Sequence, residues 1–151
     1  KEVGSDFRLF SYNFAFQKDL KFVFELNKKH RLYFLVVFPK IKSSTKSVYL
    51  RIKKYSKLKI FKKSNLHLKK DFISYLKNSK NDLQLIVEKK HPIIKRLLKN
   101  ISSIKGCHFS RMTGSGSSCY GIFNNERNSK VALRKLKNKF PNFLYFSAKS
   151  I

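Results

Sequence analysis

The sequence predicts an α+β fold, a split βαβ (ferredoxin-like) sandwich with helices on one face of its sheet. Three observations indicate this class. Two β-prone runs flank a Gly/Ser loop and form a hairpin in the second half of the chain. An apolar strand followed by helical spacing precedes this hairpin, and an amphipathic helix with an alternating strand follows it. The order strand, helices, strand, strand, helix, strand suits a split βαβ unit.

The first strand of this plan covers the apolar residues Leu32 to Phe38. A proline follows it, and its missing N–H suits the end of a strand. Ser43 or Ser44 can N-cap a helix that begins near Thr45 and runs to about Lys54. The Lys-rich residues 56–70 show weak periodicity, and we interpret them as a solvated linker.

Helical spacing returns after this linker. Two apolar groups carry it, namely Phe72, Ile73 and Leu76, and then Leu83, Ile86 and Val87. Pro92 can begin a further helix, because its missing N–H needs no partner in a first turn, and Gly106 lies just past the expected end.

The hairpin strands are expected at Cys107 to Met112 and Cys119 to Phe123. Asn124 or Asn125 can cap the helix that follows them. The last strand, Asn142 to Ala148, alternates between two faces. Near the other end of the chain, the aromatic residues between Tyr12 and Phe24 also alternate and indicate strand material.

The net charge of +27 invites a nucleic-acid interpretation. However, the lysines occur in nearly every part of the 151-residue chain, which is typical of compositional drift rather than of a dedicated patch. The charge could instead help to attract a polyphosphate substrate. The 42% hydrophobic residues interrupt every Lys run, which argues against disorder.

Metal, membrane and disulfide features are not expected. The histidines and the two cysteines lack the spacing of metal ligands, and Cys107 and Cys119 form no C-x-x-C pair. No apolar run approaches the roughly 20 residues of a membrane span. We therefore expect a reduced, cytoplasmic protein without a metal of its own in these residues.

The residues from Phe109 to Phe123, FSRMTGSGSSCYGIF, hold the strongest functional signal. Two glycines two positions apart allow positive φ and a close approach of the backbone to a ligand. Successive N–H groups in such a loop can form an anion-binding concavity. The pattern is neither a Walker A loop nor GxGxxG, and a plain turn remains the alternative.

Four stretches together resemble the GHMP kinases, in particular those acting on 4-diphosphocytidyl-2-C-methyl-D-erythritol in the non-mevalonate route to isoprenoids. In chain order they are VGSDFRLF (3–10), PKIKSSTKSVY (39–49), NDLQLIVEKKHP (81–92) and RMTGSGSSCYGIF (111–123). The resemblance covers only the C-terminal half of such a kinase, since no stretch matches the glycine-rich ATP loop or the N-terminal lysine of the family. We interpret the chain as a fragment or a shortened gene product, and we expect it to be inactive by itself.

The resemblance also implies an organisation and a chemistry. Residues 1–28 would be a remnant of the N-terminal domain, and residues 29–151 would form the GHMP kinase C-terminal domain. The intact parent would use ATP and Mg²⁺ to phosphorylate the 2-hydroxyl of the diphosphocytidyl substrate. No specific nucleic acid and no membrane would take part, and the sequence leaves the oligomeric state open.

Site residues follow from the same match. Asp6 falls on the catalytic aspartate of the family, and a turn cap is the alternative for it. Thr45 matches a substrate-contacting threonine, although its hydroxyl could simply bond its own backbone. The loop supplies the remaining substrate-binding candidates, which are Gly114, Ser115, Gly116 and Ser117. Asn81 and Asp82 are expected only to cap a helix.

Two alternatives remain open on the sequence. An RNA-binding module shares the split βαβ plan and a basic surface, but the ribonucleoprotein motif that such a module needs on a central strand has no match here. The Asn-Asp-Leu stretch at 81–83 and the RMTGSGS stretch at 111–117 argue against a GHMP kinase of the homoserine or mevalonate type.

Overall fold

The computed structural model describes residues 9, 11, 12, 15–17, 22–25, 30–56 and 68–150. The chain divides into two compact units, Lys1–Arg31 with Ile151, and Leu32–Ser150. In the first unit, β1 (Ala15–Gln17) and β2 (Val23–Glu25) pair antiparallel with Phe16 opposite Phe24. Of the alternating aromatics that the structure describes, Phe16 and Phe24 lie in these strands, whereas Tyr12 and Phe22 lie outside them.

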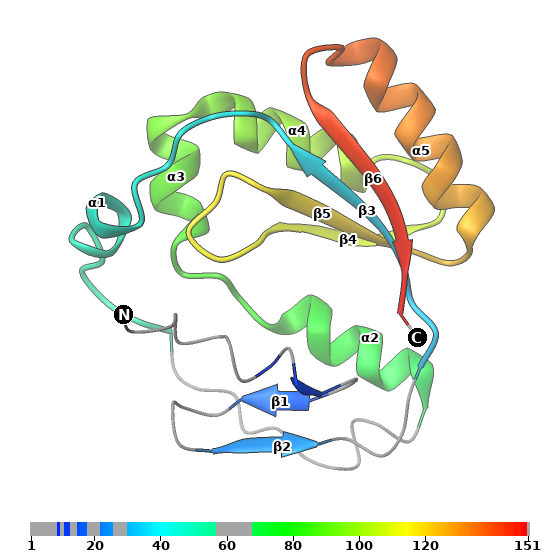
Figure 1. Ribbon diagram of the computed structural model, residues 1–151, viewed down its shortest axis with the longest axis horizontal. Helices are drawn as coiled ribbons and strands as arrows, with labels where there is room; N and C mark the ends of the chain where they lie inside the picture. The colour runs from blue at the N-terminus through cyan, green and yellow to red at the C-terminus, as the bar shows by residue number, and fades with distance from the viewer. Residues whose placement is uncertain are drawn as a thin grey trace. The chain divides into compact units, whose positions relative to one another are not determined.

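The second unit is built on a four-stranded antiparallel sheet with the order β4-β5-β3-β6 (Figure 1). Its strands are β3 (Tyr33–Phe38), β4 (Cys107–Met112), β5 (Cys119–Phe123) and β6 (Leu144–Lys149). In the centre, Leu35 lies opposite Gly121 of β5 and Ser147 of β6. The β4–β5 hairpin pairs with β3 through β5, and helices lie between β3 and β4 and between β5 and β6 in the sequence. This is the order of a split βαβ fold, so the predicted fold class is confirmed.

In the described part of the chain, five helices connect or flank these strands. They are α1 (Thr45–Tyr49), α2 (Lys69–Asn78), α3 (Gln84–Lys90), α4 (Pro92–Ser102) and α5 (Glu126–Lys139). Ser44 accepts from the N–H of Ser47 at the start of α1, and Asn125 accepts from Asn128 at the start of α5. These two N-caps are among the residues that the sequence offered for the role.

Three expected boundaries were wrong, and one of them is the start of the last strand, which is Leu144 rather than Asn142. Helix α1 ends at Tyr49 rather than near Lys54, because the N–H groups of Arg51 and Ile52 bond to carbonyls only three residues back and tighten the chain into turns. The linker expected at residues 56–70 also extends too far toward the C-terminus. Lys69 and Lys70 belong to α2, whose buried residues Phe72 and Ile73 lie in its first turns.

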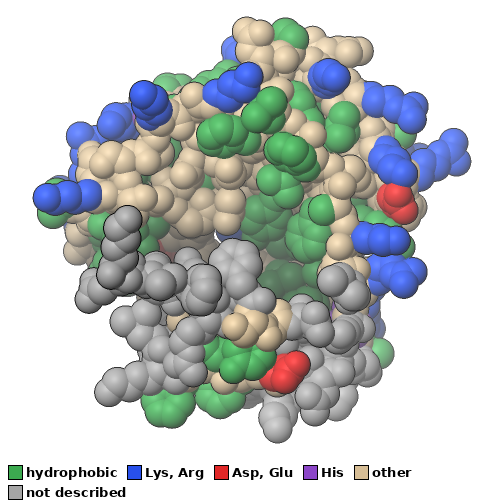
Figure 2. All heavy atoms as spheres, in the orientation of Figure 1, with side chains coloured by type: hydrophobic (Ala, Val, Ile, Leu, Met, Phe, Trp, Pro, Cys, Tyr) green, Lys and Arg blue, Asp and Glu red, His purple; other side chains and the backbone are tan. Residues whose placement is uncertain are grey.

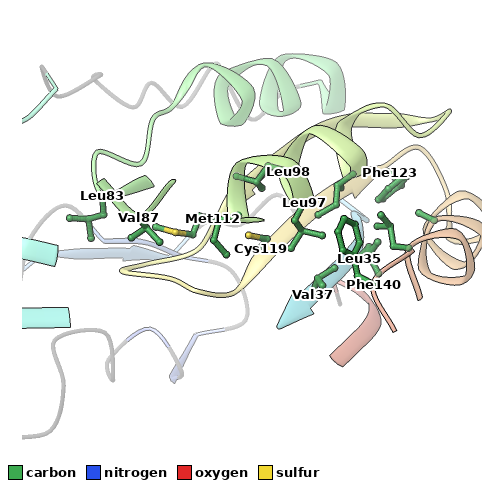
Figure 3. Packing of buried hydrophobic residues seen from close by; sticks show 14 of the residues in the cluster. Leu35, Val37, Leu83, Val87, Leu97, Leu98, Met112, Cys119, Phe123 and Phe140 are labelled. Atoms are coloured by element: carbon green, nitrogen blue, oxygen red, sulfur yellow. The ribbon is translucent and has the colours of Figure 1, made fainter. Parts of the chain in front are cut away.

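The main core lies between the sheet and helices α3, α4 and α5. Helix α4 buries Ile94, Leu97, Leu98 and Ile101 along one side. Figure 3 shows Leu83 and Val87 beside Met112 and Cys119 at one end of this core, and Leu35 with Phe140 at the other. A Cβ added at Gly121 would lie 2.5 Å from Cγ2 of Ile101, so α4 packs directly on the β5 backbone. This packing fixes the base from which the hairpin loop extends.

The opposite face of the sheet is covered by helix α2 only near β4 and is exposed toward β6. Helix α2 contacts β4 there, since Arg111 donates to the carbonyls of Leu76 (2.7 Å) and Lys77 (3.2 Å) at the end of the helix. The sequence had predicted helices on one face only. Toward β6 this face carries exposed side chains of Phe38 (38%), Leu144 (42%) and Phe146 (56%), and Figure 2 shows hydrophobic side chains gathered in this region.

Candidate functional site

The loop between β4 and β5 is a tight turn closed by its own backbone. The N–H of Thr113 donates to the carbonyl of Ser118 (2.9 Å), and the N–H of Gly116 donates to the carbonyl of Thr113 (3.0 Å). Gly114 has φ +52° and Gly116 has φ +82°. Both glycines therefore adopt the left-handed conformation that the sequence assigned to them.

The start of α1 lies against this loop. Oγ1 of Thr45 is 2.9 Å from Oγ of Ser115, and Oγ of Ser43 donates to the carbonyl of Ser115 at 2.9 Å. The hydroxyl of Ser117 donates to the carbonyl of Ile41 at 2.7 Å. Two stretches about 70 residues apart in sequence thus form one surface, and the predicted residues Thr45 and Ser115 meet in it.

A third segment, just before α3, contacts the loop from another side. Nδ2 of Asn81 donates to the carbonyls of Met112 (2.8 Å) and Gly114 (2.9 Å). Oε1 of Gln84 accepts from the N–H of Met112 at 3.0 Å. The residues at the root of the loop are therefore held by two amide side chains.

Asp82 faces the other way. Its carboxylate accepts from the N–H of Ser56 (2.8 Å) and from the hydroxyl of the same residue. These hydrogen bonds hold the pKa of Asp82 below its ordinary value. The expected cap was wrong, because Leu83 is the N-cap of α3 and no described side chain caps it. Instead, Asn81 Oδ1 accepts from the N–H of Leu83, and Asp82 anchors the segment that follows α1.

The arrangement leaves backbone donors available at the loop. Within the described part of the chain, the N–H groups of Gly114 and Ser115 have no hydrogen-bond acceptor, whereas Ser117 is buried. A Cβ built on Gly114 would meet no atom within 4 Å, so open space adjoins the backbone there. Free N–H groups beside open space, next to a hydroxyl pair, suit the oxygens of a phosphate.

The two thiols of the hairpin carry no negative charge that would repel a phosphate. Burial raises the pKa of the Cys119 thiol to about 12 and that of the Cys107 thiol to about 11, so both are neutral near pH 7. Among the residues described, no three of the types His, Cys, Asp and Glu lie close enough together to hold a metal ion.

The other predicted site residues have different outcomes. Asp6 lies outside the described residues, so its role stays a prediction. Ser117 is in the loop, but the residue is only 2% exposed, and its hydroxyl donates to the carbonyl of Ile41. Ser43, Asn81 and Gln84 were missed as loop contacts. The only available signal was their place inside the quoted stretches 39–49 and 81–92, since a single sequence does not show which side chain reaches a loop far along the chain.

A sequence model described as "GHMP kinases C terminal" matches residues 59–142, which include α2 to α5 and the hairpin. The chain belongs to the GHMP kinase family. The match gives the RNA-binding alternative no support, because the split βαβ sheet is now accounted for by a family of kinases.

Three curated relatives of this GHMP kinase domain are each named 4-diphosphocytidyl-2-C-methyl-D-erythritol kinase. The protein of Anaplasma phagocytophilum is 35% identical over 78% of this chain, and that of Pelagibacter ubique is 32% identical over 84%. The protein of Wolbachia pipientis is 43% identical over 48% of the chain. These alignments span 39%, 44% and 25% of the respective relatives, so the chain spans less than half of their length.

Solved structures agree with the fold. A crystal structure of 4-(cytidine 5'-diphospho)-2C-methyl-D-erythritol kinase gives a TM-score of 0.68 with 16% identity, covering 98% of this chain and 54% of that one. A homoserine kinase from Cytophaga hutchinsonii gives 0.67 with 14% identity, covering 91% and 47%. Because the two scores are nearly equal, they show the shared GHMP kinase fold and do not separate substrates.

None of the helices in the described residues has both the length and the apolar character needed to cross a bilayer.

Proposed function

We propose that residues 29–151 form the C-terminal domain, and residues 1–28 part of the N-terminal domain, of an ATP-dependent kinase that phosphorylates the 2-hydroxyl of 4-diphosphocytidyl-2-C-methyl-D-erythritol. The activity, substrates and partners are those of a protein of the relatives' length, of which the chain spans less than half. The relatives' names support the substrate class. The observation that carries the proposal is the meeting of Thr45 with Ser115 beside a loop whose N–H groups are available to a ligand.

Each residue has a proposed role. The N–H groups of Gly114 and Ser115 would bind phosphate oxygens of the substrate, and the absence of a side chain at Gly114 would let the substrate approach. The hydroxyl of Thr45 would contact the methylerythritol end. Asp6 would orient the acceptor hydroxyl and take its proton, since phosphoryl transfer depends mainly on positioning and on charge stabilisation.

ATP and Mg²⁺ belong to this proposal as well. When bound, ATP supplies the phosphoryl group and Mg²⁺ neutralises part of its charge. The free loop amides are compatible with a phosphate-bearing ligand. We assign no residue of this chain to the metal ion.

The remaining partners follow from the same proposal. We propose a cytoplasmic protein that binds small molecules and has no specific nucleic-acid partner. Nucleic acid should then bind only through charge, with an affinity indifferent to sequence that falls steeply with salt because counterions are released. A sequence preference above about ten-fold at physiological salt would contradict this part of the proposal.

The site can be tested by titrating the ¹⁵N-labelled chain with the diphosphocytidyl substrate. We expect amide shifts at Gly114 to Ser117, with smaller or no shifts at the far turn around Gly106. Phosphorylation of the substrate's 2-hydroxyl by the protein that contains this sequence would then establish the reaction. Shifts spread evenly over lysine-rich surfaces, with none at the loop, would contradict the site.

A further inference from the structure

The hairpin loop begins at an unusual junction with the sheet. Among the strands that the structure describes, β4 lies at the edge of its sheet, and none of them pairs with its outer side. At its last residue, the N–H of Met112 donates to Oε1 of Gln84 (3.0 Å), and the carbonyl accepts from Nδ2 of Asn81 (2.8 Å). Two amide side chains therefore bond the backbone groups that a further strand would otherwise bond.

Asn81 extends this hold into the loop itself. Its Nδ2 also donates to the carbonyl of Gly114 at 2.9 Å, so the two bonds of one amino group span Thr113. Its Oδ1 accepts from the N–H of Leu83 at 3.0 Å. Donor and acceptor ends of the amide are both in use, which fixes its orientation between the loop and α3.

We propose that Asn81 is a positioning residue that sets the conformation of the Gly/Ser loop, with Gln84 fixing the strand end that precedes it. By holding two carbonyls on either side of Thr113, Asn81 restrains the residues whose N–H groups remain available, Gly114 and Ser115. The ligand side of this inference rests on the proposed function, whereas the conformational side does not. Asn81 acts through the loop and needs no contact with substrate.

The chemistry distinguishes the two amides. Residue 81 must donate twice, which a carboxylate of the same size cannot do, although it could still accept from Leu83. Residue 84 needs only an acceptor for Met112, which a carboxylate provides. Because Nε2 of Gln84 donates to Glu88 at 2.8 Å, the matched control is the exchange Gln84→Glu with Glu88→Gln, which keeps one amide, one carboxylate and the net charge.

The conformational test measures amide hydrogen exchange on the 151-residue chain with Asn81→Asp, Asn81→Ala and the exchanged Gln84→Glu/Glu88→Gln pair. The reporter is the N–H of Gly116, which donates to Thr113. The internal reference is the N–H of Asn124, which donates to Gly106 at the far end of the hairpin. We expect protection of Gly116 to fall about ten-fold relative to Asn124 in both Asn81 variants, from the loss of two neutral hydrogen bonds. The exchanged pair should change the ratio less than about two-fold.

Two results would overturn the inference. One is an unchanged Gly116-to-Asn124 ratio in both Asn81 variants. The other is an equal fall at both amides, which would mean that Asn81 supports the whole domain and not the loop in particular. The alanine variant keeps the test decisive if the aspartate variant does not fold, because it introduces no charge.

Ligand affinity separates this inference from the proposed function. For 4-diphosphocytidyl-2-C-methyl-D-erythritol, we expect Asn81→Asp to weaken binding about ten-fold and the exchanged pair to leave it unchanged. If the unaltered protein does not bind this compound, the proposed function fails while the exchange ratio still decides the role of Asn81. If the loop loses protection and affinity is unchanged, the positioning role for this substrate is overturned.

Discussion

Thr45 and Ser115 lie 70 positions apart in the sequence, and their hydroxyl oxygens are 2.9 Å apart in the fold. Both residues were selected from separate motifs, one at the start of a helix and one in a hairpin loop. Their contact places two candidate site residues on one surface.

This hydroxyl pair leads to a first prediction. Thr45→Val and Ser115→Ala should each change the free energy of unfolding by about 0.5 kcal/mol or less, because water can replace an exposed hydroxyl partner. Each should weaken substrate binding several-fold, and the double variant should lose less than the two effects added together. Calorimetric titration and urea unfolding measure the two quantities. Strict additivity would show that the hydroxyls act independently.

The two loop glycines should behave differently when substituted. Gly114→Asn keeps a residue type that tolerates positive φ, and its Cβ would meet no atom within 4 Å, so unfolding should change little while substrate binding falls. Gly116→Ala should cost about 1–3 kcal/mol of stability, because its φ of +82° is strained for alanine and its Cβ would lie 2.7 Å from Sδ of Met112.

Thermal unfolding and binding of the two glycine variants separate these effects. If Gly114→Asn folds normally and binds substrate as tightly as the unaltered protein, the open space at Gly114 is not where the ligand approaches.

Ser117 should matter for folding more than its neighbour Ser118. Ser117→Ala removes a buried hydroxyl that donates to the carbonyl of Ile41, and the loss of one neutral hydrogen bond costs about 0.5–1.5 kcal/mol. The hydroxyl of Ser118 has no partner within the described ranges, so Ser118→Ala is the control and should be nearly neutral. Urea unfolding gives the comparison, and equal midpoints for the two variants would contradict this assignment.

Gly121 should be intolerant of even one methyl group. Gly121→Ala would place a Cβ 2.5 Å from Cγ2 of Ile101, and overpacking of this kind costs about 1–3 kcal/mol. Adding Ile101→Leu removes the branched methyl, so the double variant should recover part of the loss. Unfolding curves for both single variants and the double variant measure the coupling. An absence of recovery would mean that α4 adjusts its position instead.

His108 should make stability depend on pH. Burial, followed by the positive charges of Lys69 and Lys77, lowers the pKa of His108 below its ordinary value of 6.5. The unfolded chain therefore binds the proton more readily, so this contribution to stability is complete above about pH 6.5 and is lost as the pH falls through the lowered folded pKa. Unfolding at pH 7 and pH 5 should show a smaller difference for His108→Asn than for the unaltered chain. An identical difference in the two proteins would show that other groups control it.

The sequence alone predicted the hairpin best. Its two strands, Cys107–Met112 and Cys119–Phe123, have the bounds that the pattern indicated. Alternation, glycines with positive φ and flanking caps are local signals, so neighbouring residues suffice to define them. Helix α4 likewise begins at Pro92, as the proline predicted.

The early end of α1 and the place of α2 depended on longer-range contacts. Residues 50–56 have no local signal that stops a helix, and Ser56 is held by Asp82, which lies 26 positions away. Helix α2 lies on the second face of the sheet because Arg111 bonds to its terminal carbonyls. Neither partner choice can be read from spacing along one chain.

By itself, the sequence determined the fold class, the order of the elements, the conformation of the loop and the family resemblance, since periodicity, turn residues and motifs are properties of short segments. Only the tertiary structure decided which side chains meet at the loop. It brought Thr45 and Ser43 to Ser115, turned Ser117 inward to Ile41, and placed the amide of Asn81 on two loop carbonyls. Hydrogen-bond partners of this kind are selected by the packing of helices on a sheet, which joins residues that no local pattern relates.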